Sequence, residues 1–193
     1  MRIYQLLRLS LTLTIILSTV ISAAINPKNA IGIWLFEGDA KDISGKKNHG
    51  ELMNGAGFTD KAKFNNKALS LDGKDDHVVV KSSKSLDEPV QNYTGVAWIK
   101  IKKKMLYVAG KVSVDVAASG TFGLKGKDLW IGAQSPNRRP TSGLIDDVGV
   151  FNKALSAANI NTILKDGLGS ILATTAVSPK DRLTTTWSHI KSQ

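Results

Sequence analysis

The 193-residue chain contains no cysteine and only three glutamates, Glu37, Glu51 and Glu88, which lie on different segments. The absence of cysteine excludes disulfide bonds and thiolate metal sites. The three histidines occur in unrelated contexts, and the sequence has no Gly-x-Ser-x-Gly elbow, His-Glu-x-x-His helix or phosphate-binding loop. These absences leave the chain without the common signatures of an enzyme, and we assign no catalytic residue.

The chain is basic, with 26 Lys and Arg against 16 Asp and Glu and a formal net charge of +10. Most of the positive charge is scattered lysine, densest between Lys100 and Lys104. No aromatic residues alternate with these lysines to stack on bases, so we do not expect nucleic acid as a partner. The lysine run is interpreted either as a solvated strand end or as a patch that attracts acidic polysaccharide or an anionic cell surface.

Residues 1–24 have the layout of a secretory signal peptide. Arg2 and Arg8 precede an apolar run from Leu9 to Ile25, which is interrupted by Ser and Thr and contains the small residues Ser22-Ala23-Ala24. Cleavage after Ala24 would leave a secreted chain of charge +8, at the cell surface or outside the cell. The alternative is an uncleaved signal that anchors the chain in a membrane.

Beyond the signal, short apolar segments alternate with Gly, Asn, Asp and Ser clusters, a pattern typical of many short strands joined by turns. We therefore predict a single all-β domain over residues 25–167, followed by a docked or frayed tail over residues 168–193. One short helix is expected between a Ser156 cap and Gly167, plugging one end of the domain. The nine predicted strands are Ile31–Phe36, Glu51–Asn54, Ala68–Leu71, His77–Lys81, Val96–Ile101, Met105–Val108, Val112–Val116, Leu129–Ile131 and Leu144–Phe151.

Two early motifs combine core residues with turns. Trp34 and Phe36 alternate on one strand and are expected to face the core together, and the sequence Asp42-Ile-Ser-Gly-Lys-Lys-Asn48-His-Gly follows. The segment Phe64–Val80 contains Asp72-Gly73, which is expected to form a hairpin turn between two apolar alternations. Within that segment His77 is interpreted as a packed surface residue, and Asp75 and Asp76 as turn residues.

Two later motifs are Val96-Ala-Trp98-Ile-Lys100 and the string Gly143-Leu-Ile-Asp146-Asp147-Val-Gly-Val-Phe-Asn-Lys-Ala-Leu-Ser156. Together the four ordered motifs resemble the laminin-G-like, concanavalin-A-like jelly-roll domain of bacterial secreted proteins. The resemblance runs from about Ile31 to Lys165 and implies an antiparallel β-sandwich.

The sequence departs from the family in its middle. Relatives usually have several tens of residues between the strand containing Trp98 and the strand containing Tyr107, whereas here the two residues are nine positions apart. We therefore expect a sandwich truncated in the middle, whether by natural deletion or by an error in the gene model.

The resemblance also implies a structural Ca²⁺ between the early loop and the closing strand. Carried over to this sequence, its ligands are Asp42, Asn48, Asp146 and Asp147, a set of hard oxygen donors that favours Ca²⁺ over zinc or copper. An aspartate on an otherwise apolar strand is costly unless it is paired or coordinated. The alternative is that these residues cap loops through hydrogen bonds.

The relatives further imply a binding or adhesion module that recognises carbohydrate, extracellular matrix or a cell-surface ligand. Trp130, Arg138 and Arg139 are the candidate ligand-binding residues, because Trp130 lies close to the loop that holds the two arginines, whereas Trp98 is expected in the core. A structural or vestigial domain without a ligand is the alternative. A glycoside hydrolase is less favoured, because it needs two carboxyl groups flanking one bond, and adjacent residues such as Asp146 and Asp147 point to opposite faces of a regular strand.

Overall fold

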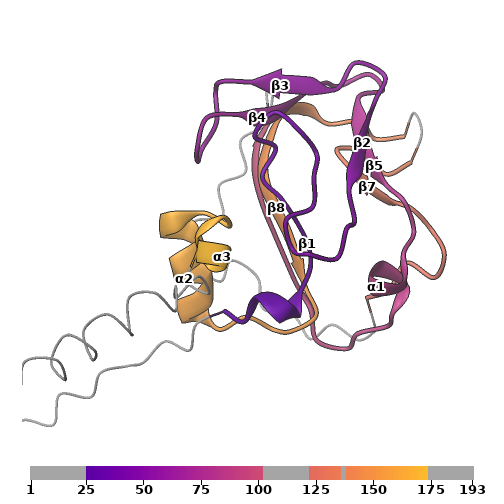
Figure 1. Cartoon of the computed structure of the whole chain (residues 1–193). Helices are drawn as coiled ribbons and strands as arrows, with labels where there is room; N and C mark the ends of the chain where they lie inside the picture. The colour runs from indigo at the N-terminus through magenta and orange to yellow at the C-terminus, as the bar shows by residue number, and fades with distance from the viewer. Residues whose placement is uncertain (1–24, 102–121, 136–137, 174–193) are drawn as a thin grey trace, which may run out of the picture.

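The computed structural model describes residues 25–101, 122–135 and 138–173. In these ranges the chain forms two antiparallel sheets packed face to face, with a helical layer outside one of them (Figure 1). The predicted all-β antiparallel sandwich is confirmed. None of the helices in the described part of the chain has the length and apolar character needed to cross a membrane.

The larger sheet has five strands and is organised around β8 (Ser142–Phe151). One edge of β8 pairs with β6 along eight residues, from Thr94 opposite Phe151 to Ile101 opposite Gly143. The other edge of β8 pairs first with β4 and then with β1. The remaining strands of this sheet are β1 (Ala30–Trp34), β3 (Gly57–Thr59), β4 (Ala68–Asp72) and β6 (Thr94–Ile101).

The smaller sheet has three strands, with β5 (His77–Val80) between β2 (Gly50–Met53) and β7 (Leu129–Ile131). All four residues of β5 are buried, because both of its edges are paired and both of its faces are covered. The bounds of β5 and β7 follow the sequence prediction closely.

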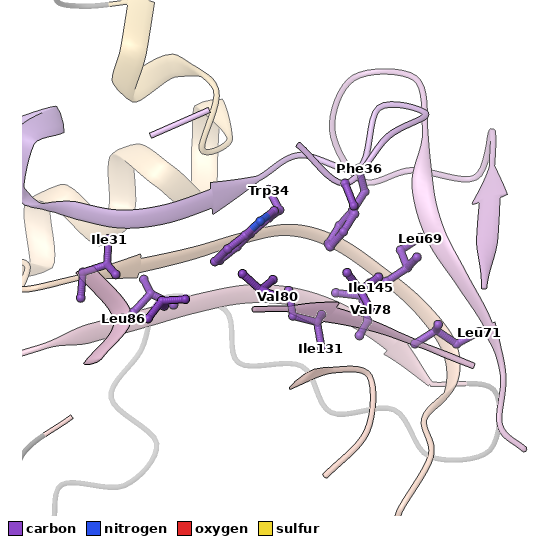
Figure 2. Packing of buried hydrophobic residues seen from close by; sticks show 12 residues of the cluster. Ile31, Trp34, Phe36, Leu69, Leu71, Val78, Val80, Leu86, Ile131 and Ile145 are labelled. Carbon is purple, nitrogen blue, oxygen red and sulfur yellow. The ribbon is translucent and has the colours of Figure 1, made fainter. Parts of the chain in front are cut away.

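The main core lies between the two sheets. Trp34 and Phe36 point into it together, as predicted, beside Val78 and Val80 of the facing strand β5 and Ile145 of β8 in the larger sheet (Figure 2). Trp34 is completely buried. Burial of such large side chains supplies most of the favourable free energy of the sandwich.

A second core lies on the outer face of the larger sheet, under α2 (Ala157–Asp166) and α3 (Ser170–Ala173) (Figure 1). The Ser156 hydroxyl accepts a hydrogen bond from the Asn159 N–H, and Gly167 ends α2 with φ of 75°, so the predicted cap and stop are correct. The helix covers a sheet face instead of plugging an end. Leu168 and Ile171 are buried in this core, so packing continues past the predicted boundary at residue 167.

Three local predictions differ from the structure. The turn at Asp72-Gly73 does not make a hairpin, because β4 belongs to the larger sheet and β5 to the smaller one. Strand β3 and two short helices, η1 (Pro27–Asn29) and α1 (Lys84–Asp87), were not predicted. The signal peptide, the strands expected at 105–108 and 112–116, the shortened middle and the tail beyond residue 173 lie outside the described residues.

Candidate functional site

A cleft of about 390 Å³ opens between the sheets, where β6 and β8 face β7. Apolar side chains of the three strands form its floor, and Gln134, Arg139 and Thr141 add polar groups. The other lining residues are Ala97, Ile99, Leu129, Trp130, Ile131, Gly132, Ala133, Ile145, Val148 and Val150.

Trp130 is held in place by His77. The two rings stack with centroids 4.5 Å apart and planes inclined by 29°. His77 is only 3% exposed, and its Nδ1 lies 2.6 Å from the carbonyl oxygen of Asp75. His77 is therefore packed, as interpreted, but it is buried and not at the surface. No local sequence signal reveals its contact with Trp130, because the two lie on different strands, β5 and β7.

The two candidate arginines have different positions. Arg139 lines the cleft and adopts a positive φ of 50°, a conformation that costs a non-glycine residue free energy. Arg138 is not among the lining residues, and its backbone closes the loop through hydrogen bonds with Gln134 and Ser135. In the described part of the chain, neither guanidinium forms an ion pair.

Asp42 organises the early loop through four hydrogen bonds. Its Oδ1 accepts from the N–H groups of Ile33 at 3.0 Å and Ser44 at 2.8 Å. Its Oδ2 accepts from the Ser44 hydroxyl and from the Asn48 N–H, both at 2.9 Å. An ionised carboxylate offers about four lone-pair positions, so this carboxylate is already saturated.

Asn48 continues the same network. Its Nδ2 donates to the carbonyl oxygen of Ile31 at 2.7 Å and to the Ser85 hydroxyl at 2.9 Å, and its Oδ1 accepts from the Ser83 hydroxyl at 2.6 Å. Its own carbonyl oxygen accepts from the Trp34 indole at 2.8 Å. The motif therefore ties the early loop to β1 and to the start of α1.

Asp146 and Asp147 lie elsewhere, at a β-bulge in β8. The register slips between Ala97 and Trp98, so Asp146 pairs with Trp98 and Asp147 is the extra residue, with φ of 44°. Asp146 Oδ2 accepts from the N–H groups of Lys63 and Phe64. Asp147 Oδ2 accepts from the Leu168 N–H at 2.9 Å.

The bulge brings both carboxylates to the outer side of the larger sheet. Trp98 pairs with Asp146, and the N–H of Leu168 donates to Asp147. Both Trp98 and Leu168 belong to the second core. The Phe64 ring packs edge-on against Trp98 with centroids 5.0 Å apart. The expectation that the two carboxylates point to opposite faces is therefore wrong, because it assumed a regular strand.

Each carboxylate has one buried oxygen without a partner. Asp146 is 3% exposed and Asp147 is fully buried, and the Oδ1 atom of each has no hydrogen bond. Burial raises the pKa of Asp146, against the opposing effect of its backbone hydrogen bonds. Burial, reinforced by the negative charges of Asp146 and Glu37, raises the pKa of Asp147 to about 6.

Glu37 was not predicted as a site residue, yet it contributes negative charge to the same region. Its two oxygens accept from the N–H groups of Asn66 and Lys67. Together, Glu37 and Asp146 accept hydrogen bonds from four backbone N–H groups between residues 63 and 67. The sequence feature that could have identified Glu37 is its position directly after Phe36, at the end of an apolar strand.

The predicted four-residue ligand set thus divides into two groups. Asp42 pairs with Trp34 on one edge of β1, and Val148, the residue after Asp147, pairs with Trp34 on the other edge. The backbones of Asp42 and Val148 are therefore about two strand spacings, or 10 Å, apart. In the described ranges no hydrogen bond joins Asp42 or Asn48 to Asp146 or Asp147.

A third acidic group comprises Asp72, Asp75 and Asp76. Asp76 bonds the N–H groups of Gly55 and Asp72 through its two oxygens. These contacts stabilise a turn, in agreement with the interpretation of Asp75 and Asp76 as turn residues.

Comparison with known proteins supports the resemblance found in the sequence. A family model described as the concanavalin A-like lectin/glucanases superfamily matches residues 102–161. Among solved structures, the chain is similar to domain 4 of AbnA, a GH43 extracellular arabinanase from Geobacillus stearothermophilus, determined in complex with arabinotriose. The identity is 14% and the TM-score 0.52, over 70% of this chain and 98% of that domain. No curated protein matches the sequence.

Proposed function

We propose that the chain is a secreted, non-catalytic carbohydrate-binding module and that the cleft between β6, β7 and β8 is its saccharide site. The observation that carries this proposal is that Trp130 and Arg139, two of the three candidate ligand-binding residues, line the same cleft. The similar arabinanase domain, determined with arabinotriose, supports a saccharide as the ligand class. The signal-like residues 1–24 support export.

Leu129 and Ile131 point into the core between the sheets, so the Trp130 indole lies on the opposite face of the edge strand β7, beside His77, and meets the cleft at that edge. There it is suited to stack on the apolar face of a sugar ring. His77 packs against the indole, so little side-chain freedom remains to be lost on binding. Large aromatic side chains with fixed orientation dominate the energetics of many binding sites. Gln134 and Thr141 add side-chain hydrogen-bonding groups for sugar hydroxyls at the same cleft.

Arg139 favours a saccharide that carries an acidic group. Among the described residues, the cleft lining includes Arg139 and no Asp or Glu. Guanidinium binds carboxylate through two parallel, charge-assisted hydrogen bonds, which are stronger than its hydrogen bonds to the neutral hydroxyls of a sugar. A uronate-containing oligosaccharide therefore matches the cleft better than a neutral one.

The buried carboxylates do not support hydrolysis of the bound saccharide. A glycosidase needs two carboxyl groups flanking the scissile bond. Asp146 and Asp147 share one side of the sheet, but they are enclosed beneath the second core and do not line the cleft. This arrangement agrees with a protein that binds a saccharide without cleaving it.

The proposal is tested by titrating the mature chain with neutral arabino-oligosaccharides and with uronate oligosaccharides, using isothermal titration calorimetry after a glycan-array screen. Trp130→Ala should abolish binding. Tyr93→Ala is the matched control, because Tyr93 is a 52% exposed aromatic that does not line the cleft. Equal binding by the wild type and Trp130→Ala would exclude the cleft as the saccharide site. If the wild type binds no glycan at all, a purely structural domain is favoured.

A further inference from the structure

Residues 54–56 connect β2 of the smaller sheet to β3 of the larger one (Figure 1). The connection begins with Asn54-Gly55, the single Asn-Gly pair in the whole sequence. Asparagine is chemically labile, because the backbone nitrogen of the next residue can attack its side-chain amide carbon. Glycine at that next position leaves the nitrogen unhindered. Whether the attack takes place in the folded protein depends on the geometry of this turn.

The turn holds Asn54 in a strained conformation. The Met53 carbonyl oxygen accepts from the Ala56 N–H at 3.2 Å, so residues 53–56 form a β-turn. Asn54 has φ of 63°, whereas the φ of Gly55 is not positive, which is the pattern of a type II′ turn. Such a turn favours glycine at its first central position, and here asparagine occupies it. The ψ of that position is about −120°, which turns the Gly55 nitrogen toward the amide carbon of Asn54.

Two hydrogen bonds fix the side chain and the nitrogen on the same side of the turn. Asn54 Nδ2 donates to the carbonyl oxygen of Asp75 at 2.7 Å, and the Gly55 N–H donates to Asp76 Oδ1 at 2.8 Å. Because the two acceptors belong to adjacent residues, the amide and the N–H both face the start of β5. Asp76 is only 4% exposed, and its Oδ2 accepts from the Asp72 N–H at 2.9 Å, so its carboxylate is held in place.

We infer that Asn54 is a site of self-modification, at which Gly55 is the nucleophile, Asp76 is the general base and the products are aspartate and isoaspartate. A general base must lie within about 2.6–3.2 Å of the atom whose proton it removes, and Asp76 Oδ1 meets this condition at the Gly55 nitrogen. A nucleophile beside a fixed base is the usual arrangement for attack on a carbonyl carbon.

The reaction needs only water as a second reactant. The Gly55 nitrogen forms a bond to the Asn54 amide carbon, and its proton passes to Asp76 Oδ1. The bond from that carbon to Nδ2 then breaks, and the nitrogen leaves as ammonia with the proton that Asp76 accepted. Water opens the resulting five-membered imide at either carbonyl carbon. Asn54 is exposed, so water reaches the ring.

Both products alter the joint between the two sheets. Each replaces the amide by a carboxylate, which removes the donor to Asp75 and adds a negative charge beside the group of Asp72, Asp75 and Asp76. Isoaspartate also lengthens the backbone by one carbon between β2 and β3. The modified chain should therefore be less stable. The inference is independent of the saccharide proposal, because the turn does not line the cleft.

The test is peptide mapping by mass spectrometry of the mature chain, incubated at neutral pH either folded or unfolded in urea. Asn54 should convert about tenfold or more faster in the folded chain, because a positioned base accelerates a reaction by about 10²–10⁴-fold. Asp76→Asn should slow conversion in the folded chain by about tenfold or more, since an amide oxygen accepts the Gly55 N–H but cannot take up its proton. In urea the variant and the wild type should react equally.

Two variants serve as controls. Asn54→Gln should stop the conversion, because its longer side chain would have to close a six-membered ring. Asp87→Asn is the matched control for Asp76→Asn, because Asp87 Oδ1 accepts from the Gly126 N–H at 2.9 Å in a separate turn. It should leave the rate at Asn54 unchanged. Faster conversion in urea than in the folded wild type would overturn the inference, whether or not Asp76→Asn folds. Equal rates in folded Asp76→Asn and the wild type would overturn the role of Asp76.

Discussion

His77 and Trp130 form a stacked pair across β5 and β7, with ring centroids 4.5 Å apart. The pair joins a buried residue of the smaller sheet to the aromatic residue at the cleft. The affinity of the proposed saccharide site should therefore depend on a residue that does not line it.

His77→Ala should weaken saccharide binding and lower stability, whereas His77→Phe should largely preserve binding. Stacked aromatic pairs contribute about 0.5–1.5 kcal/mol beyond the area they bury, and the alanine variant loses this support for the indole. Calorimetric titration and thermal unfolding of both variants measure the two effects. Equal affinity of His77→Ala and the wild type would show that Trp130 does not need His77.

Arg139→Gln should reduce the affinity for a uronate oligosaccharide by about tenfold and leave binding of a neutral oligosaccharide nearly unchanged. Hydrogen bonds to charged groups contribute about 1.5–3 kcal/mol, which corresponds to at least this factor. Arg138→Gln is the control, because Arg138 does not line the cleft. The wild-type preference should also decrease with added salt, and a preference that survives Arg139→Gln would contradict the assigned role.

Asp42→Ala should destabilise the domain by about 2–4 kcal/mol, because it leaves several buried donors unpaired. The loss should be the same with and without Ca²⁺. Asp39→Ala, in an exposed pair with Lys41, should change stability by no more than about 0.5 kcal/mol. Urea unfolding of both variants gives the comparison, and a small loss in Asp42→Ala would show that the network is not structural.

Leu168→Ala should cost about 2–5 kcal/mol, the usual range for a buried leucine. Leu168 is fully buried beneath the helical layer, although the sequence places it at the start of the tail. Lys165→Ala, at an exposed position of α2, is the control. Unfolding free energies within about 0.5 kcal/mol of each other would mean that the second core does not extend to Leu168.

In the presence of a chelator, the contribution of Asp147 to the free energy of unfolding should fall as the pH rises from about 4 to about 6. The pKa of Asp147 is raised from 3.8 to about 6, so the folded state binds more protons than the unfolded state in this window. The effect amounts to about 3 kcal/mol once Asp147 is ionised. Asp147→Asn should remove this part of the stability difference between pH 4 and pH 7.

The stability difference between the wild type and Asp147→Asn is the quantity to compare. Burial raises the pKa of Asp146 as well, whereas hydrogen bonds lower the pKa of Asp39 and Asp128, so the total pH dependence mixes both signs. Parallel profiles for the two proteins would contradict the assignment to Asp147.

Local chemistry was sufficient to predict much of the fold. Trp34 and Phe36 face the core because side chains alternate along a strand. Strands such as Leu129–Ile131 and His77–Val80 appear as short apolar runs between turn residues. Ser156 and Gly167 delimit α2 because a hydroxyl can cap a helix and glycine tolerates a positive φ.

The candidate site depended on contacts between distant residues. The sequence named Asp42, Asn48, Asp146 and Asp147, but the number of lone pairs left on each carboxylate depends on which backbone N–H groups the folded chain brings near it. The placement of Asp147 follows from a register slip against β6, some fifty residues earlier in the chain. The sequence alone determined the residue types, their alternation and the ends of several elements, since these are set within a few residues. Only the tertiary structure decided which carboxylates were saturated, which shared a face and which aromatic ring was supported, because each of these depends on pairing between segments far apart in the chain.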